Sequence, residues 1–178
     1  MNYLIIGGSK SGKSEIGEKI SLSLNNDKVI YIATMKPYDK EDDERIEKHK
    51  ENRKGLNFKV IEQQRNLHQI VDSITINDTV LIDSITSLLT NEMFIENTIV
   101  KSPSVDILSG LKKIMTRAEN TLIVSDYIFN DSIVYDEVTE KFKKELAYIN
   151  IELAKLCENV IECSFGNVKY LKCKEKFN

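Results

Sequence analysis

Short apolar runs alternate with longer amphipathic stretches along most of the chain. The apolar runs predict strands at Tyr3–Ile6, Lys28–Ala33, Phe58–Ile61, Thr79–Ile82, Thr121–Ser125, Val160–Ser164 and Val168–Leu171. Strands that alternate with helices are typical of βαβ units, so the pattern predicts an α/β fold with a mostly parallel sheet. The last two runs flank Phe165-Gly166-Asn167, a sequence that favours a turn. We therefore expect the chain to end in an antiparallel hairpin at an edge of the sheet.

The stretches between the strands show helical periodicity. It predicts helices over Lys13–Leu24, Asp42–Arg53, Ser84–Asn97, Ser104–Ala118 and Asp136–Cys157. In the last of these, apolar residues recur every three or four positions and form a stripe that should pack on the sheet. Helices that connect parallel strands cover both faces of a sheet, and we expect that arrangement here.

Composition narrows the class of protein further. A chain of 178 residues and 20.4 kDa is the length of one domain, so residues 1–178 are expected to form a single domain. The net charge of −3 argues against nucleic-acid binding through a basic surface. The chain contains no apolar run long enough for a membrane span, and its three cysteines lack metal-site spacing, so we expect a cytoplasmic protein.

A glycine-rich loop follows the first predicted strand and precedes the first predicted helix. The loop fits the pattern G-x-x-x-x-G-K-[ST] and consists of Gly7, Gly8, Ser9, Lys10, Ser11, Gly12, Lys13 and Ser14. In such a phosphate loop, backbone N–H groups and the helix N-terminus bind phosphate oxygens. Lys13 would neutralise the β- and γ-phosphates of ATP or GTP, and the Ser14 hydroxyl would bind Mg²⁺. A glycine-rich turn that only caps a helix is the alternative interpretation.

A second acidic ligand for Mg²⁺ is expected where another strand ends. Asp83 follows the apolar run Thr79–Ile82, and parallel strands bring their carboxyl ends to one edge of the sheet. Asp83 is therefore the candidate that holds Mg²⁺ together with Ser14, either directly or through water. An aspartate that merely caps the following helix is the alternative interpretation, and the phosphate loop found above favours the metal role.

The densely charged predicted helix contains a cationic stripe. Arg45, His49 and Arg53 are spaced i, i+4, i+8 and share one helical face. Such a face can bind phosphates through its arginines and present an imidazole as acid, base or nucleophile. From the residues alone, a solvated face with Glu/Lys pairs is the other interpretation, and it is the more frequent one.

The order of these motifs resembles a known family. The chain carries Gly7-Gly8-x-x-Ser11-Gly12-Lys13-Ser14, then Tyr31-Ile32-Ala33-Thr34, Arg45-Ile46-x-x-His49-x-x-x-Arg53, Glu62, and Leu81-Ile82-Asp83-x-x-Thr86 followed by Asn91. This order is similar to that of the bifunctional adenosylcobinamide kinase / adenosylcobinamide-phosphate guanylyltransferase family of cobalamin biosynthesis. The resemblance covers nearly the whole chain, and its most specific element is the Arg-Ile-x-x-His-x-x-x-Arg segment.

The resemblance implies a RecA-like P-loop NTPase fold and two reactions. Adenosylcobinamide would be phosphorylated, and GMP would then pass from GTP to that phosphate through a covalent intermediate on the histidine matching His49. The residues implied around the guanine nucleotide are Thr34, Met35, Lys36, Lys50, Glu51, Asn52, Arg53, Glu62 and Asp83. The resemblance further implies a homo-oligomer, a trimer in the best-described member.

The chain departs from the family pattern after its fifth predicted strand. Where family members carry an Asn-Glu-Val-Gly-x-Gly-Ile-Val-Pro-like run, this chain has Asp126–Val134 and lacks the Glu, both glycines and the Pro. This change affects the presumed corrinoid side of the site. Two alternatives to the bifunctional enzyme are therefore kept: another small-molecule P-loop kinase, or a nucleotide-binding regulatory homologue without corrinoid turnover.

Overall fold

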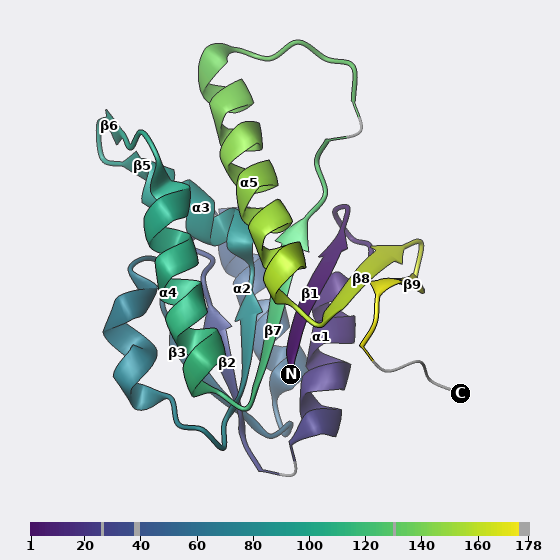
Figure 1. Cartoon of the computed structure of the whole chain (residues 1–178). Coiled ribbons are helices and arrows are strands. Elements are labelled where there is room, and N and C mark those ends of the chain that lie inside the picture. Colours follow the sequence, from purple (N-terminus) through teal and green to yellow (C-terminus); the bar gives the residue numbers. More distant parts are fainter. Residues whose placement is uncertain (26, 38–39, 130, 175–178) are drawn as a thin grey trace.

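A seven-stranded sheet forms the centre of the molecule (Figure 1). The computed structural model describes residues 1–25, 27–37, 40–129 and 131–174, with the side chains of Glu41, Asp42, Asp43, Arg45, Lys48, His49 and Asn52 also outside the description. The strands are β1 (Asn2–Gly7), β2 (Val29–Ala33), β3 (Phe58–Glu62), β4 (Thr79–Asp83), β7 (Asn120–Asp126), β8 (Asn159–Ser164) and β9 (Asn167–Lys172). Their order is β3-β2-β4-β7-β1-β8-β9, and only the β8–β9 pairing is antiparallel.

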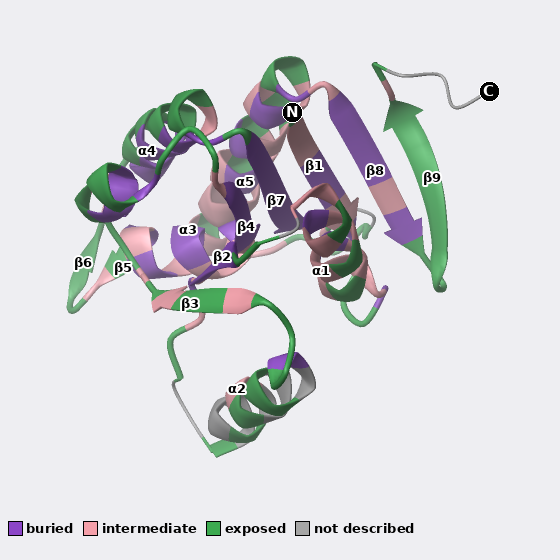
Figure 2. Ribbon diagram, turned by 90° about the horizontal axis from the view of Figure 1, so that it is seen from below, coloured by how far each residue is buried: buried purple, intermediate pink, exposed green. Residues whose placement is uncertain are grey.

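The predicted α/β fold and its C-terminal hairpin are thereby confirmed. Ser164 pairs with Asn167, so the hairpin loop consists of Phe165 and Gly166, which have positive φ angles of 52° and 73°. Two successive positive φ angles are the geometry of the tight turns that match the twist of a hairpin. The exposed strand β9 ends the sheet on this side (Figure 2).

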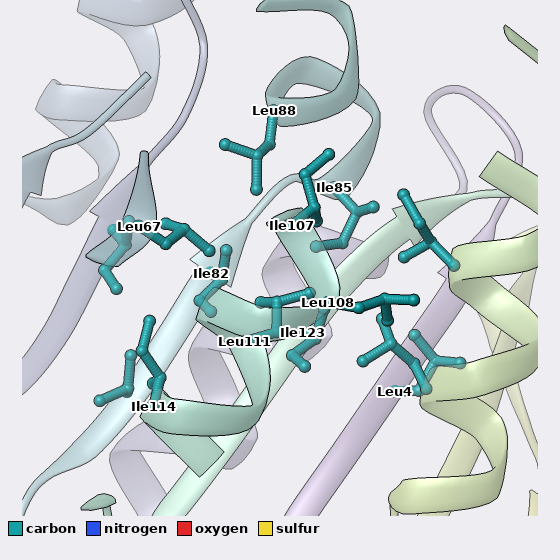
Figure 3. Close-up of a cluster of buried hydrophobic side chains, with 14 of the residues drawn as sticks. Leu4, Leu67, Ile82, Ile85, Leu88, Ile107, Leu108, Leu111, Ile114 and Ile123 are labelled. Atoms are coloured by element: carbon teal, nitrogen blue, oxygen red, sulfur yellow. The ribbon is translucent and has the colours of Figure 1, made fainter. Parts of the chain in front are cut away.

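Helices cover both faces of the sheet, as predicted. The helices are α1 (Lys13–Leu24), α2 (Lys40–Arg53), α3 (Ile85–Met93), α4 (Pro103–Arg117) and α5 (Glu137–Leu156), with a 3₁₀ helix, η1, at Leu67–Ser73. Alternate strand residues point to opposite faces. Leu4 therefore packs in one buried cluster with α3, α4, α5 and η1, whereas its neighbour Ile5 packs in the other cluster, against α1. Figure 3 shows the larger cluster, where Ile82 and Ile123 of the sheet meet α4 side chains such as Leu111.

The predicted helix Ser84–Asn97 was too long. Helix α3 begins at Ile85 with Ser84 as its N-cap and ends at Met93, and a small hairpin of β5 (Phe94–Ile95) and β6 (Thr98–Ile99) follows. Glu96, with φ at 52°, makes the turn between them. The ring of Phe94 stacks on that of Phe142 in α5 at a centroid distance of 6.4 Å. A tertiary contact thus overrides the local helical pattern.

The arrangement of α2 matters most for function. Figure 2 shows α2 beyond β3, apart from the body of the sheet, with many of its described residues exposed.

Because β1, β2, β4 and β7 are parallel, the loops that follow them lie at one edge of the sheet. The phosphate loop, Thr34, Asp83 and Asp126 therefore come together there, although they are far apart in sequence.

Cys157, directly after α5, should resist thiol reagents at neutral pH. It is fully buried, and this burial raises the pKa of its thiol from 9.0 to about 12. The thiolate is the reactive form, so native Cys157 should stay unmodified at pH 8 while the half-buried Cys173 reacts. An unfolded chain loses this proton at lower pH, so the free energy of unfolding should fall as pH rises from 9 towards 12. Peptide mapping after labelling checks this, and rapid modification of native Cys157 would contradict it.

Candidate active site

The phosphate loop joins β1 directly to α1. Strand β1 ends at Gly7 and α1 begins at Lys13, with Gly12 as its N-cap in the left-handed region at φ 90°. Lys10 also has a positive φ, of 55°. A glycine cap has no side chain to accept a bond from the first N–H groups of the helix, so these donors are left for anionic ligands. The local geometry is that of a phosphate cradle.

Gly7 is required here for steric reasons. A Cβ atom at this position would lie 2.6 Å from the carbonyl oxygen of Cys163 in β8 and would also clash with Oγ of Ser11. Gly7→Ala should therefore lower the free energy of unfolding by about 1–3 kcal/mol, since neighbouring backbone must shift. Gly8→Ala is the matched control, because nothing lies within 4 Å of its added Cβ. Urea unfolding measures both, and equal stabilities of the two variants would contradict this packing argument.

Lys13 makes an ion pair across the edge of the sheet. Its Nζ lies 2.6 Å from Oδ1 of Asp126, the last residue of β7, and 3.1 Å from the carbonyl oxygen of Gly8. The two side chains of the ion pair are only 11% and 23% exposed, so water screens this pair less than a surface ion pair. The ammonium group of Lys13 is thus held over the phosphate loop.

Asp83 is held by a buried tyrosine. The Tyr31 hydroxyl, from β2, donates a hydrogen bond of 2.8 Å to Oδ2 of Asp83, at the end of β4. Burial, together with the charge of Asp83, raises the pKa of Tyr31 far above its usual range, so the phenol keeps its proton and remains a donor. One carboxylate oxygen of Asp83 is thereby fixed. Asp83 and the Ser14 hydroxyl line the same pocket and are hard oxygen donors of the kind that suit Mg²⁺.

Arg53 connects the end of α2 to α1. Its Nη1 lies 3.3 Å from Oε1 of Glu18, and its guanidinium carbon lies 3.9 Å from the centre of the Tyr31 ring. Arg53 is buried, and its Nε has no hydrogen-bond partner among the described residues. Burial raises the pKa of Glu18, although the Arg53 hydrogen bond opposes this shift. The ion pair and the ring contact together fix the C-terminal end of α2 beside the sheet.

These elements enclose a pocket of about 410 Å³, a size typical of small-ligand sites. It lies between the carboxyl ends of β2, β3 and β4 and the inner side of α2. Its lining consists of Ser14, Tyr31, Ala33, Met35, Pro37, Ile46, Glu47, Lys50, Arg53, Val60, Glu62, Gln64, Asp83, Ser84 and Ser87. The Nζ atom of Lys50, a lining residue, lies 3.2 Å from Oε1 of Glu47 and 3.6 Å from Oε1 of Glu62. The pocket therefore joins the phosphate loop to the charged helix.

The side chains of Thr34 and Asn91 form hydrogen bonds to the backbone at the edge of the sheet next to the pocket. The Thr34 hydroxyl donates to the carbonyl oxygen of Ser84 and accepts from its N–H, at 2.7 Å in each case. Asn91 of α3 donates to the carbonyl oxygens of Thr34 and Gln64, at 2.8 and 3.0 Å. The fully buried Thr34 side chain thus ties β2 to β4. This arrangement fixes the backbone that carries Asp83.

The pocket gathers several, but not all, of the residues expected at the nucleotide. Ser14, Met35, Lys50, Arg53, Glu62 and Asp83 line it. Gly8, Ser9, Lys10, Lys36 and Glu51 are exposed, and Ser11 is buried in the loop with an unpartnered Oγ among the described groups. The side chains of His49 and Asn52 lie outside the described residues, although both positions fall within α2. The assignment of all these residues to nucleotide binding stays a prediction.

Sequence reasoning missed three members of this site. Asp126 could have been found, since it ends a predicted strand in the same way as Asp83. Tyr31 belongs to a quoted motif, but its hydrogen bond to Asp83 joins residues 52 positions apart. Glu18 gives no local signal, because on the sequence it is one of many acids on an amphipathic helix.

The described part of the chain contains no cluster of three or more His, Cys, Asp or Glu side chains placed to hold a metal ion. None of its helices combines the length and apolarity that a membrane crossing requires.

Similar folds occur in solved structures. The flagellar accessory protein FlaH from Methanocaldococcus jannaschii aligns with 97% of this chain and 78% of its own, at a TM-score of 0.54 and 14% identity. The KaiC-like protein PH0186 from Pyrococcus horikoshii OT3 aligns with 99% of this chain and 81% of its own, at a TM-score of 0.56 and 11% identity. A third similar structure, an ATPase domain, gives a TM-score of 0.53 at 14% identity, over 90% and 68% of the two chains. The fold and the phosphate loop together define a P-loop protein of RecA-like architecture.

Within that class the sequence is more specific. Residues 3–170 match the family model described as cobinamide kinase / cobinamide phosphate guanyltransferase, and the chain belongs to this family. Both activities in that description are transferase activities. The bifunctional adenosylcobalamin biosynthesis proteins CobU of Escherichia coli K12 and Salmonella typhimurium LT2 are each 34% identical over 95 residues. That aligned region is 53% of this chain and 51% of each relative, so the match spans about half the length of these curated relatives.

Proposed function

We propose that this chain is a bifunctional transferase of cobalamin biosynthesis that phosphorylates adenosylcobinamide and then transfers GMP from GTP to the resulting phosphate. One observation carries the proposal. A single pocket links the phosphate-loop residue Ser14 and the acid Asp83 to Lys50 and Arg53, which belong to the charged helix of the family motif. The match of residues 3–170 to the family model supports the same function.

In the kinase reaction, the phosphate loop binds the triphosphate of ATP or GTP. Backbone N–H groups at the start of α1 donate to phosphate oxygens, and Lys13 neutralises charge near the terminal phosphoryl group. Ser14 and Asp83 are the residues that would hold Mg²⁺, which neutralises phosphate charge when bound. The hydrogen bond from Tyr31 keeps Asp83 in position for this role.

In the GMP transfer, His49 is the proposed nucleophile. A neutral imidazole nitrogen forms a bond to the α-phosphorus of GTP while the bond to the pyrophosphate oxygen breaks. The phosphate of the corrinoid then displaces the histidine and takes the GMP. Ile46, Lys50 and Arg53 of α2 line the pocket, and His49 lies between them in the sequence, which supports this assignment. The chain is further proposed to be one domain that assembles as a homo-oligomer, a trimer by family resemblance.

Product analysis by mass spectrometry tests the proposal. Adenosylcobinamide, GTP and Mg²⁺ should give two new products with the chain, the corrinoid phosphate and its GDP derivative, because each half-reaction leaves its own mass. ATP alone should give at most the phosphate. Binding of GTP without turnover of the corrinoid would contradict the proposal and favour a regulatory homologue, whereas phosphorylation of a different small molecule would favour another kinase.

A further inference from the structure

The lysine of the phosphate loop has a charged partner on another strand. Asp126 ends β7, which lies beside β1 in the sheet, and it is paired in register with Gly7. The distance between Oδ1 of Asp126 and Nζ of Lys13 is 2.6 Å. A hydrogen bond between two ionised groups is roughly twice as strong as one between neutral groups. Lys13 therefore has a strong acceptor within the protein itself.

This ion pair is sheltered from water. The side chains of Lys13 and Asp126 are 11% and 23% exposed, whereas both side chains of the Lys19–Glu15 pair on the same helix are 68% exposed. Exposed pairs contribute little, because water and salt screen their charges. A sheltered pair keeps more of its attraction, so we expect the contact between Lys13 and Asp126 to be formed in most molecules.

The backbone that carries the carboxylate is fixed by three elements. The N–H of Asp126 donates to Oγ1 of Thr86 in α3 at 3.2 Å, and its carbonyl oxygen accepts from Nδ2 of Asn150 in α5 at 3.3 Å. The next N–H, that of Tyr127, donates to the carbonyl oxygen of Gly7 in β1 at 2.9 Å. The ion pair can therefore break by rotation of its side chains while the backbone stays in place.

A bound triphosphate needs the same ammonium group. A phosphate-loop lysine contacts the β- and γ-phosphates, and an ammonium group has three N–H donors. In the structure, Nζ of Lys13 contacts Asp126 and the carbonyl oxygen of Gly8, so two of the three donors are already used. Contacts to two phosphates thus require the release of at least one partner. While Asp126 stays, it also neutralises the charge that attracts the phosphates.

We propose that Asp126 is an autoinhibitory residue, which lowers nucleotide affinity because its carboxylate competes with the phosphates for Lys13. This inference rests only on the phosphate-loop part of the proposed function. Phosphate oxygens take the ammonium group from the carboxylate when a nucleotide binds, and the carboxylate takes it back when the nucleotide leaves. The family pattern has Asn where this chain has Asp126, so the competing charge distinguishes this chain from the pattern.

Asp126→Asn tests the competition by calorimetry with ATP and GTP. Asparagine keeps the size and the backbone bonds, but its neutral amide oxygen binds an ammonium group less tightly. A partner that leaves Lys13 free in about one molecule in ten lowers the apparent affinity ~10-fold, so the affinity for both nucleotides should rise ~10-fold in the variant. Without nucleotide, the variant should unfold at a lower urea concentration than the wild-type chain, because the ion pair is lost.

Asp131→Asn is the matched control. It removes the same charge from the segment between β7 and α5, but Asp131 pairs with Lys143, at 3.3 Å, and not with the phosphate loop. Its nucleotide affinity should therefore equal that of the wild-type chain. A rise as large as that of Asp126→Asn would mean that net charge controls binding, and it would overturn the specific role of Asp126.

A Lys13→Ala background shows whether the lysine mediates the effect. Without the ammonium group there is nothing to compete for, so adding Asp126→Asn should change nucleotide affinity less than about twofold. An equally large gain in this background would overturn the competition and indicate simple repulsion between the carboxylate and the phosphates.

The remaining outcomes separate this inference from the proposed function. Unchanged affinity in folded Asp126→Asn would overturn the role of Asp126, and so would weaker affinity, which would make the carboxylate part of the binding site. A wild-type chain that binds nucleotide but does not convert the corrinoid would contradict the proposed function alone. A wild-type chain that binds neither ATP nor GTP would contradict the phosphate-loop assignment, and the competition would fail with it.

Discussion

Lys13→Ala is expected to weaken triphosphate binding and both half-reactions together. The lysine is the charged group of the phosphate loop, and its Nζ is held over the loop by Gly8 and Asp126. Loss of one charge-assisted contact to phosphate costs about 1.5–3 kcal/mol, or roughly a 10- to 100-fold loss of affinity. Because such a group stabilises charge that develops during transfer, turnover should fall by a further ~10²–10³-fold. Calorimetry with ATP and GTP and the two product assays measure these effects.

Lys19→Ala is the control for this prediction. Lys19 is on the same helix, but it is exposed and pairs only with Glu15 among the described ion pairs, at 2.8 Å. Exposed pairs of this type contribute little to stability, so the control should retain binding and turnover. Urea unfolding of Lys13→Ala separates a lost contact from a misfolded chain. Normal nucleotide affinity in a folded Lys13→Ala protein would refute the assignment of the phosphate loop.

Much of the fold could be predicted because its signals are local. Most sheet strands are short apolar runs bounded by polar residues, and the loop after β1 carries a motif typical of a strand–loop–helix unit. The hairpin Phe94–Ile99 was not predicted, because its first residues continue the helical pattern of the preceding segment. Its geometry depends on the stacking of Phe94 against Phe142, a residue far along the chain.

The same difference holds for the site. Positions set by the topology of the sheet could be predicted, whereas pairs set by tertiary contacts could not. The location of Asp83 at this edge could be predicted because strand ends of a parallel sheet converge by topology, whatever the intervening sequence. The partners of the site's charged groups were not found, since Lys13–Asp126 and Arg53–Glu18 depend on which strands are neighbours and on how α2 lies against α1. The second pair gives the arginine an anchoring role. Sequence alone suggested only phosphate binding for Arg53.

The contacts of Arg53 determine where the charged helix α2 is held relative to the pocket. The Tyr31 ring contacts Arg53 on its face and donates to Asp83 through its hydroxyl. One side chain of β2 therefore connects the end of α2 to the proposed Mg²⁺ ligand. A helix fixed at its C-terminal end keeps the preceding turn, which carries position 49, close to the pocket lined by Ile46, Glu47 and Lys50.

His49→Ala should abolish covalent labelling of the chain by α-labelled GTP. The proposed intermediate contains a bond between an imidazole nitrogen and phosphorus, which is stable to alkali and labile to acid. Without the nucleophile, the adduct should decrease by at least ~10³-fold, as is typical when a covalent catalyst is removed. Denaturing electrophoresis of the labelled protein measures this effect. ATP-dependent phosphorylation of adenosylcobinamide should persist in the variant, because the kinase reaction uses the phosphate loop and not this histidine.

His68→Ala provides the matched control, because His68 is the other of the two histidines in the chain. It belongs to η1, where it lines a separate surface depression with Asp72 and Arg117. This variant should form the adduct as the wild-type chain does. Labelling that survives in His49→Ala but disappears in His68→Ala would move the nucleophile away from the pocket, to η1. Labelling that survives in both variants would place the adduct on a residue other than these two histidines. Transfer of GMP by a wild-type chain that forms no adduct would instead indicate one direct displacement by the corrinoid phosphate.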